Sequence, residues 1–216
     1  MHMTLKAAEV YIIDDDAAGR EAVAVLVRTL GLVVKEYDSA ENFLQSYSGH
    51  RPACIVADLR MLGMSGLELL QELRRRGLSV PVIILTAHAD TPTTVQAMKS
   101  GAFTTLDKPC RDSELWETIR AALHDDIRRS EEDRRRQQVQ ERLDSLTPAE
   151  RDVLKHLVAG DPNKMIAHRL DISLRTVEGR RQSLFQKMEV ESIAELVKQV
   201  MLVDPTLIPP ATSDGS

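Results

Sequence analysis

The sequence contains few aromatic residues and almost no cysteine. Phe, Trp and Tyr make up 3% of the 216 residues, so the cores must be built mainly from aliphatic side chains. The two cysteines, Cys54 and Cys110, lack the spacing of a metal site, and the six histidines are scattered. These features argue against a disulfide framework and against a zinc or iron centre, and they predict free thiols in a reducing cytoplasm.

Long apolar runs are also absent. No run reaches the length of about 18 residues that marks a membrane-spanning helix, and no basic stretch followed by an apolar one opens the chain. We therefore expect neither a membrane span nor a secretory signal, and a cytoplasmic protein with no membrane partner. The 43% of hydrophobic and 28% of charged residues are ordinary for a globular protein, and the length allows two small domains or one large one.

The formal net charge of −5 argues against a chain that binds nucleic acid over its whole surface. Basic residues nevertheless concentrate between residues 164 and 187, where Asp171 and Glu178 are the acidic residues. The basic residues of this segment are Lys164, Arg169, Arg175, Arg180, Arg181 and Lys187. We therefore expect a local basic surface.

The first half alternates short apolar runs with segments of helical periodicity. Strands that are apolar along their whole length are typical of a parallel sheet covered by helices on both faces. We expect a doubly wound α/β domain over residues 6–123, with five strands at residues 10–13, 33–37, 53–57, 82–85 and 104–106. Thr91 and Pro92 are predicted to cap and open the fourth helix.

Residues 124–142 are almost wholly polar and contain no Gly or Pro. This composition favours a solvated helical linker. A dimerising coiled coil is the alternative, but the segment lacks three continuous heptads with apolar core positions.

From Thr147 onwards the pattern predicts only helices. Thr147-Pro148-Ala149-Glu150 is a capping box with proline at the first helical position. We expect an all-α domain over residues 143–204, with four helices at about 148–159, 163–170, 174–188 and 192–202, and then a disordered tail over residues 205–216.

Five polar residues follow the predicted strands at the edge where the carboxyl ends of the strands meet, which is where open α/β sheets bind ligands. They are Asp14, Asp15, Asp58, Thr86 and Lys108. Crowded carboxylates repel one another unless a cation enters, and a hard divalent ion such as Mg²⁺ suits oxygen ligands. Such an ion would neutralise a phosphoryl group transferred to a carboxylate. Lys108 would contact a phosphate oxygen, and the Thr86 hydroxyl would donate a hydrogen bond to it.

The residues around this edge form five motifs: Ile12-Ile13-Asp14-Asp15-Asp16, Asp58-Leu59-Arg60-Met61, Gly63-Met64-Ser65-Gly66, Leu85-Thr86-Ala87 and Lys108-Pro109. Together they resemble the receiver domains of two-component response regulators across residues 8–123. The resemblance implies that a histidine kinase phosphorylates Asp58. It also implies a Mg²⁺ ion bound by Asp15, with Asp14 assisting, and a cis Lys108–Pro109 bond. The further implied protein ligands of the ion are Asp58 and the main-chain carbonyl of Arg60.

Two positions depart from the pattern of this family. Leu62 stands where the family usually has proline, which should make the loop after Asp58 less stiff. Thr105 stands where the family typically has Tyr or Phe, a ring that swings inward as the position of Thr86 moves towards the phosphate. We therefore expect the phosphorylation signal to leave the domain by another route.

In the C-terminal half, a short helix, a turn and a longer basic helix predict a helix-turn-helix, although four small helices could also form a protein-binding bundle. Apolar residues form one stripe of the long helix, at Val177, Leu184, Phe185 and Met188. The residues expected to face away from this stripe are Glu178, Gly179, Gln182, Ser183 and Gln186. Gln182 and Glu178 are candidate base readers. The candidate phosphate contacts are Lys164, Arg180, Arg181 and Lys187.

Three motifs of this half are Leu146-Thr147-Pro148-Ala149-Glu150-Arg151-Asp152-Val153-Leu154, Asn163-Lys164-Met165-Ile166-Ala167 and Arg175-Thr176-Val177-Glu178. They closely resemble LuxR-type DNA-binding domains, and the whole chain resembles the NarL/FixJ family of transcriptional response regulators, closer to the FixJ branch. The resemblance implies DNA contacts by Arg175 and Thr176 and dimerisation through residues 192–202. The implied partners are a histidine kinase, double-stranded promoter DNA, a second copy of the chain on DNA and, as a further candidate, RNA polymerase.

Gly179 is unusual in the middle of a recognition helix, where glycine costs roughly 1 kcal/mol relative to alanine. Close approach to a base or methyl group would explain it, and so would a lack of room for a side chain.

We expect a transcription factor, not an enzyme, whose DNA binding is promoted by phosphorylation of Asp58. Two alternatives stay open. Asp14-Asp15-Asp16 superficially matches the Asp-x-Asp motif of aspartate-nucleophile phosphatases with Asp14 as nucleophile, but Ala18 stands where that motif has Thr or Val. Thr105 motivates the second alternative, a regulator that binds DNA without control by phosphate.

Overall fold

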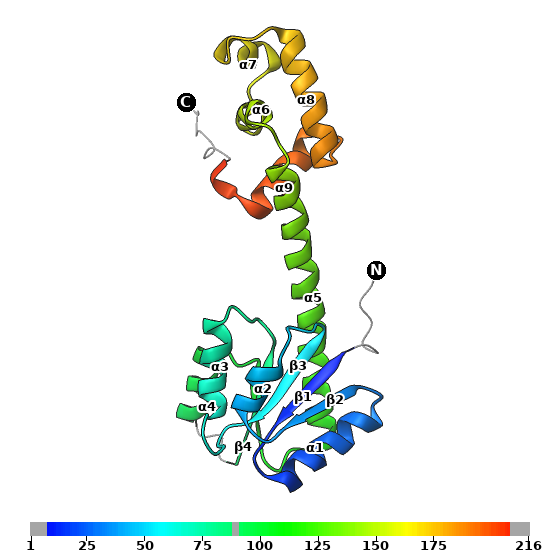
Figure 1. Cartoon of the computed structure of the whole chain (residues 1–216), viewed down its shortest axis with the longest axis vertical. Coiled ribbons are helices and arrows are strands. Elements are labelled where there is room, and N and C mark those ends of the chain that lie inside the picture. The colour runs from blue at the N-terminus through cyan, green and yellow to red at the C-terminus, as the bar shows by residue number, and fades with distance from the viewer. Residues whose placement is uncertain (1–7, 88–90, 208–216) are drawn as a thin grey trace, which may run out of the picture. The chain divides into compact units, whose positions relative to one another are not determined.

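The computed structural model describes residues 8–87 and 91–207, and the chain divides into two compact units between Glu131 and Glu132 (Figure 1). The first unit alternates strands and helices, as the apolar runs predict. Its elements are β1 (Glu9–Ile13), α1 (Ala17–Thr29), β2 (Val33–Tyr37), α2 (Ala40–Ser46), β3 (Ala53–Asp58), α3 (Gly66–Arg75), β4 (Val82–Thr86), α4 (Thr91–Ser100), β5 (Thr104–Asp107) and the first part of α5 (Asp112–Asp144).

The five strands form one parallel sheet in the order β2-β1-β3-β4-β5. This confirms the predicted doubly wound fold. The chain turns first to one side of β1 and then to the other, so the loops after β1 and β3 diverge at the carboxyl edge of the sheet. Such a switch point is where doubly wound sheets bind their ligands.

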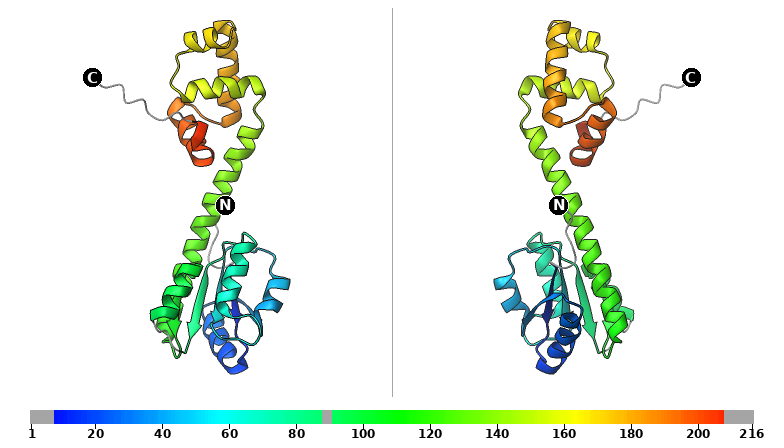
Figure 2. Two further views of the ribbon diagram at one scale, coloured as in Figure 1. Left: turned by 90° about the vertical axis from the view of Figure 1, so that its left-hand side faces the viewer. Right: turned by 90° about the vertical axis from the view of Figure 1, so that its right-hand side faces the viewer.

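Helices cover both faces of the sheet (Figure 2). Because side chains alternate along a strand, Val10 and Ile12 of β1 pack with α1 and α5, whereas Tyr11 and Ile13 pack with α2 and α3. The few aromatic residues are concentrated on the second of these faces, with ring centroids 5.0 to 6.3 Å apart among Tyr11, Tyr37, Phe43 and Tyr47. The core there is therefore less aliphatic than the composition suggests.

Residues 112–144 form one continuous helix, α5, so the segment predicted as a helical linker is helical throughout. Its residues 132–138 are all exposed. In the part of α5 that precedes these residues, the fully buried Asp126 connects the helix to the sheet. Its carboxylate accepts a hydrogen bond from the Ala53 N–H at 2.9 Å and pairs with the Arg51 guanidinium at 2.8 Å. Both charges of this pair are satisfied, which a buried ion pair requires.

The second unit is helical. The end of α5 is followed by α6 (Pro148–Val158), α7 (Asn163–Arg169), α8 (Leu174–Met188) and α9 (Ile193–Val203), which enclose one apolar core. The predicted capping box at the start of α6 is confirmed, with Thr147 and Glu150 each accepting a hydrogen bond from the other's main chain. No helix of the described residues is long and apolar enough to cross a membrane.

The prediction of a disordered tail from residue 205 is wrong at its beginning. Pro205–Leu207 forms a 3-10 helix, because the Asp204 carboxylate accepts hydrogen bonds from the Thr206 N–H at 3.0 Å and the Thr206 hydroxyl at 2.5 Å. Leu207 also packs against the core of the unit. The rest of the predicted tail, and the side chain of Thr91 that was predicted to cap α4, lie outside the described residues.

Candidate functional site: an acidic pocket and a basic helix

The centre of the acidic pocket is the ammonium group of Lys108. Its Nζ lies 2.6 Å from Asp14 Oδ2 and 2.5 Å from Asp58 Oδ1, so one cation bridges the carboxylates that follow β1 and end β3. Both carboxylates are largely enclosed, with side-chain exposures of 5% and 12%. Burial alone would lower the pKa of Lys108, but the two hydrogen-bonded carboxylates outweigh it and raise the pKa above its usual value. The predicted convergence of these residues is therefore present.

Main-chain contacts fix the residues of the pocket. Asp14 Oδ1 accepts the Asp16 N–H at 2.9 Å, and the Asp14 carbonyl accepts the Arg20 guanidinium at 2.6 Å. Thr86 is buried, and its carbonyl accepts the Lys108 N–H at 2.7 Å. The Lys108–Pro109 bond is cis, as the resemblance implies.

Asp16 caps the start of α1, since its carboxylate accepts the Gly19 N–H at 2.9 Å. In the Asp-x-Asp alternative, the second aspartate is therefore engaged as a helix cap.

The loop between β3 and α3 closes the pocket. Asp58 Oδ2 accepts the Arg60 N–H at 2.8 Å, and Asp15 Oδ2 accepts the Leu62 N–H at 2.9 Å. The loop ends at Gly66, where an added Cβ would lie 2.5 Å from the Asp58 carbonyl oxygen. Only glycine lets the chain return this close to the end of β3. The Leu62 side chain, in the position that usually holds proline, is 82% exposed.

The donor chemistry of the pocket suits a hard divalent cation. Asp14, Asp15 and Asp58 supply only oxygen atoms, and the ammonium of Lys108 offsets only part of their charge. Asp15, the residue expected to bind the ion directly, is exposed to solvent. Within the described ranges, no three His, Cys, Asp or Glu side chains converge tightly enough to form a metal site by themselves. The expected ligand set includes one main-chain carbonyl and, as is usual for Mg²⁺, would retain water.

Thr105 is half-buried in β5, beside Ile84 of β4. At this position β5 therefore has a small hydroxyl side chain where the family typically has a ring.

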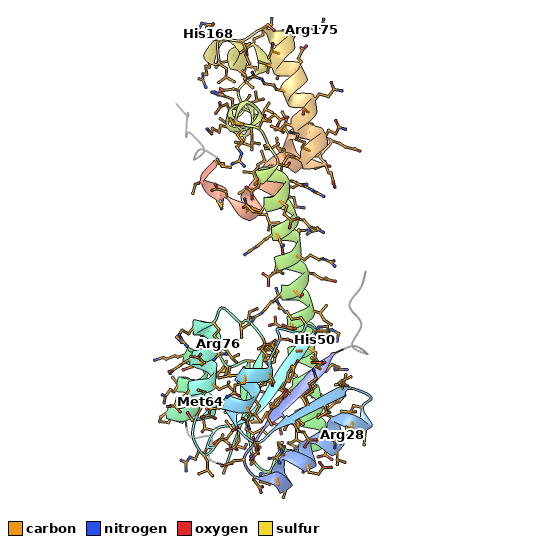
Figure 3. The ribbon with its side chains drawn as sticks, viewed as in Figure 1. Arg28, His50, Met64, Arg76, His168 and Arg175 are labelled. Carbon is orange, nitrogen blue, oxygen red and sulfur yellow. The ribbon has the colours of Figure 1, made fainter. Side chains whose placement is uncertain are left out.

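In the second unit, α7, a turn and α8 form the predicted helix-turn-helix. The apolar stripe is confirmed, because Val177, Leu184 and Met188 are fully buried and Phe185 is partly buried against them. The Ser173 hydroxyl caps α8 by accepting the Thr176 N–H at 3.1 Å. Arg175 projects from the beginning of α8 (Figure 3).

Most of the expected DNA contacts lie on accessible surface. The exposed residues of this set are Lys164, Arg175, Thr176, Glu178, Gly179 and Gln182, and Arg180 is half-buried. Among the contacts of the described residues, Glu178 forms no ion pair with Arg175 or Arg181. Around Gly179 an added Cβ would meet no described atom within 4 Å, so packing inside the domain does not require glycine there.

Three polar residues of α8 contact the domain itself. The Lys187 ammonium binds the Glu150 carboxylate at 2.7 Å, and the Ser183 hydroxyl donates to the same carboxylate at 2.6 Å. Arg181 donates to the Asn163 side chain at 3.2 Å and lies over the Phe185 ring. Ser183 was expected on the polar side of α8, facing away from the buried stripe, but it is half-buried and its hydroxyl contacts α6.

Glu150 is a residue whose second role the sequence does not predict. Burial would raise its pKa, but hydrogen bonds from Lys187, Ser183 and Thr147 outweigh burial and hold the pKa at about 2. The carboxylate is thus ionised and fastens the basic helix α8 to the start of α6. The capping-box motif identifies the local role, whereas the contact with α8 spans 33 residues of sequence and leaves no local signal.

Comparisons with known families agree with both units. The sequence matches the response regulator receiver domain over residues 10–120 and the luxR family of bacterial regulatory proteins over residues 144–200. The transcriptional regulatory protein FixJ of Azorhizobium caulinodans is 43% identical over 193 residues, which cover 89% of this chain and 92% of that protein. The response regulator protein TodT of Pseudomonas putida is 39% identical over 197 residues, which cover 91% of this chain and 87% of that protein.

Solved structures are similar over nearly the whole chain. The response regulator StyR is 36% identical with a TM-score of 0.82, covering 90% of this chain and 98% of that one. Full-length FixJ from B. japonicum is 38% identical with a TM-score of 0.57, covering 92% of this chain and 98% of that one. Both domains occur here in the same order, so the chain belongs to the FixJ-like NarL/FixJ family of transcriptional response regulators, with a receiver domain followed by a LuxR-type DNA-binding domain.

Proposed function

We propose that Asp58 is the phosphoryl acceptor of this response regulator and that a sensor histidine kinase in the cytoplasm is the donor. The observation that carries this proposal is the Lys108 ammonium, which lies 2.5 Å from Asp58 and 2.6 Å from Asp14. One oxygen of the Asp58 carboxylate forms the new bond to phosphorus while the bond to the donor breaks. Lys108 and the Thr86 hydroxyl then bind oxygens of the transferred group.

Asp14, Asp15, Asp58 and the main-chain carbonyl of Arg60 are the residues that would hold Mg²⁺. When bound there, the ion supplies positive charge against the phosphoryl oxygens. The protein contributes the position of its ligands. Asp14 is fixed by the Asp16 N–H and by Lys108, and the loop that carries Arg60 is fixed by its hydrogen bond to Asp58.

For the second unit we propose that α8 enters the major groove of promoter DNA, with a second copy of the chain on the same site. Gln182 and Glu178 are the proposed base readers, and Gly179 allows the helix to approach the bases closely. The proposed phosphate contacts are Lys164, Arg175, Thr176 and Arg180. Arg181 and Lys187 contribute positive charge, but their contacts with Asn163 and Glu150 support a role in holding α8 as well.

The phosphorylation proposal is tested by mass spectrometry after treatment with acetyl phosphate. One phosphoryl group should be added in the presence of Mg²⁺, none after chelation, and none in Asp58→Asn. Retention of the phosphoryl group in Asp58→Asn would refute the assignment. Measuring operator affinity of the same samples tests the coupling. If acetyl phosphate leaves the affinity of the wild type unchanged, the chain binds DNA without phosphate control.

A further inference from the structure

Carboxylates hold the main chain of the loop between β3 and α3. Four of its main-chain N–H groups donate to acidic side chains at 2.8 or 2.9 Å. The pairs are Arg60 with Asp58, Leu62 with Asp15, Met64 with Glu41, and Ser65 with Glu68. Charged acceptors make these hydrogen bonds stronger than ordinary main-chain ones.

The four carboxylates belong to different structural features. Asp58 and Asp15 belong to the acidic pocket, and Glu68 forms the capping box of α3 with Ser65. Glu41 belongs to neither set. It stands in the first turn of α2, and its contact with Met64 joins that helix to the middle of the loop.

The Glu41 carboxylate lies close to the main chain of the loop. Gly63 has a φ of +79°, and a Cβ added there would lie 2.7 Å from Glu41 Oε1. The carboxylate therefore lies directly against the loop main chain at two consecutive residues. Beyond it, Met64 packs against the core that contains α2 and α3 (Met64 is labelled in Figure 3). This arrangement leaves the loop little freedom on the side of α2.

We propose that Glu41 is a positioning residue for the phosphorylation pocket, which it serves by holding the β3–α3 loop and so placing the Arg60 carbonyl beside the cation. This inference rests on the proposed Mg²⁺ site. Once Asp15 and Asp58 engage the cation and the phosphoryl group, their oxygens are shared with these new partners, and their hold on the Leu62 and Arg60 N–H groups weakens. The contact between Glu41 and Met64 takes no part in that exchange and continues to fix the loop.

The test compares variants of the full chain that separate the hydrogen bond from the charge. Glu41→Gln keeps an oxygen at the same reach and removes the charge. Glu41→Asp keeps the charge and withdraws the oxygen by one methylene group. Gln45→Ala, at an exposed position of the same helix, is the matched control. Binding of magnesium chloride alone is measured by calorimetry, and hydrogen exchange of the Met64 amide is measured by NMR.

We expect Glu41→Ala and Glu41→Asp to bind Mg²⁺ about tenfold more weakly than wild type, the size of effect expected for one charge-assisted hydrogen bond. Glu41→Gln should bind about threefold more weakly than wild type, since a neutral acceptor keeps the contact at roughly half its strength. Hydrogen exchange of the Met64 amide should be faster than in wild type in Glu41→Ala and Glu41→Asp. It should change little in Glu41→Gln and Gln45→Ala. If Glu41→Ala does not fold, the comparison of Glu41→Gln with Glu41→Asp decides the question.

Two results would overturn the proposal. Equal Mg²⁺ affinity in wild type and Glu41→Asp would show that the contact does not position the loop. Equal weakening in Glu41→Gln and Glu41→Asp would show a general effect of altering the carboxylate instead of its reach. Asp15→Asn separates this failure from failure of the Mg²⁺ site itself. If wild type and Asp15→Asn both bind no Mg²⁺, the site is wrong, and the role inferred for Glu41 falls with it.

Discussion

Replacing Gly179 by alanine should make the second unit more stable and its DNA binding weaker. Gly179 lies inside α8, where a Cβ would meet open space among the described atoms. Alanine therefore gains the helix-propensity difference of about 0.5–1 kcal/mol without a packing penalty. For a domain of about 60–100 residues this corresponds to a rise in Tm of roughly 2–8 °C.

The assay uses the single tryptophan of the chain. Trp116 packs against the core of the first unit, so its fluorescence follows the unfolding of that unit, whereas circular dichroism follows the helices of both. The Gly179→Ala variant should raise the helical transition of the second unit and leave the tryptophan transition unchanged. A lower Tm would refute the argument that the site has room for a methyl group.

The same variant tests the interface. If α8 lies close to a base at residue 179, the added methyl group should reduce operator affinity by about tenfold, or about 1.4 kcal/mol. Affinity for random DNA should change less, because the helix is not seated as deeply there. A more stable protein with unchanged operator affinity would show that the DNA does not approach this position, and the proposed orientation of α8 would then be wrong.

Four other substitutions follow from the structure. Glu150→Gln should destabilise the second unit by about 1–3 kcal/mol at neutral pH in urea unfolding. Because the folded pKa of Glu150 is lowered to about 2 from 4.5, its stabilisation is present above the higher value and is lost as pH falls towards the lower. The difference between wild type and variant should therefore shrink over that range, and a constant difference would contradict the ion-pair role. Gln182→Ala should cost roughly 1–3 kcal/mol on the preferred operator and little on random DNA, and an equal loss on both would exclude base reading. Lys164→Ala should weaken binding to all sequences and lower the salt slope by about one counterion, as measured by titration at several salt concentrations. Thr105→Phe should increase dimerisation driven by phosphorylation in ultracentrifugation, and strong dimerisation that is equal in wild type and variant would make the missing ring irrelevant.

The sequence predicts the elements and the acidic pocket well because their signals are local or follow from topology. Apolar runs identify the five strands, and the Thr147 capping box identifies the start of α6. Parallel strands place their carboxyl ends at one edge, so Asp14, Asp58 and Lys108 had to converge if the fold was doubly wound.

Contacts between elements are what the sequence could not supply. The periodicity of α8 separates a buried stripe from a polar face, but it cannot tell which polar residues another helix covers. Lys187 and Ser183 reach Glu150, and Arg181 reaches Asn163, because α6 and α7 pack beside α8. The contact of Glu41 with Met64 was missed for the same reason, since 23 residues separate them.

The two ends of strand β3 make different contacts. Its last residue is Asp58, and its first residue, Ala53, donates its N–H to the buried Asp126 of α5. The residues between them are fully buried, and Ile55, Val56 and Ala57 pair with both β1 and β4. A strand of this length spans about 17–20 Å without a turn or loop. The proposed phosphoryl acceptor and the residue that anchors α5 therefore lie at opposite ends of one buried strand, with no turn or loop between them.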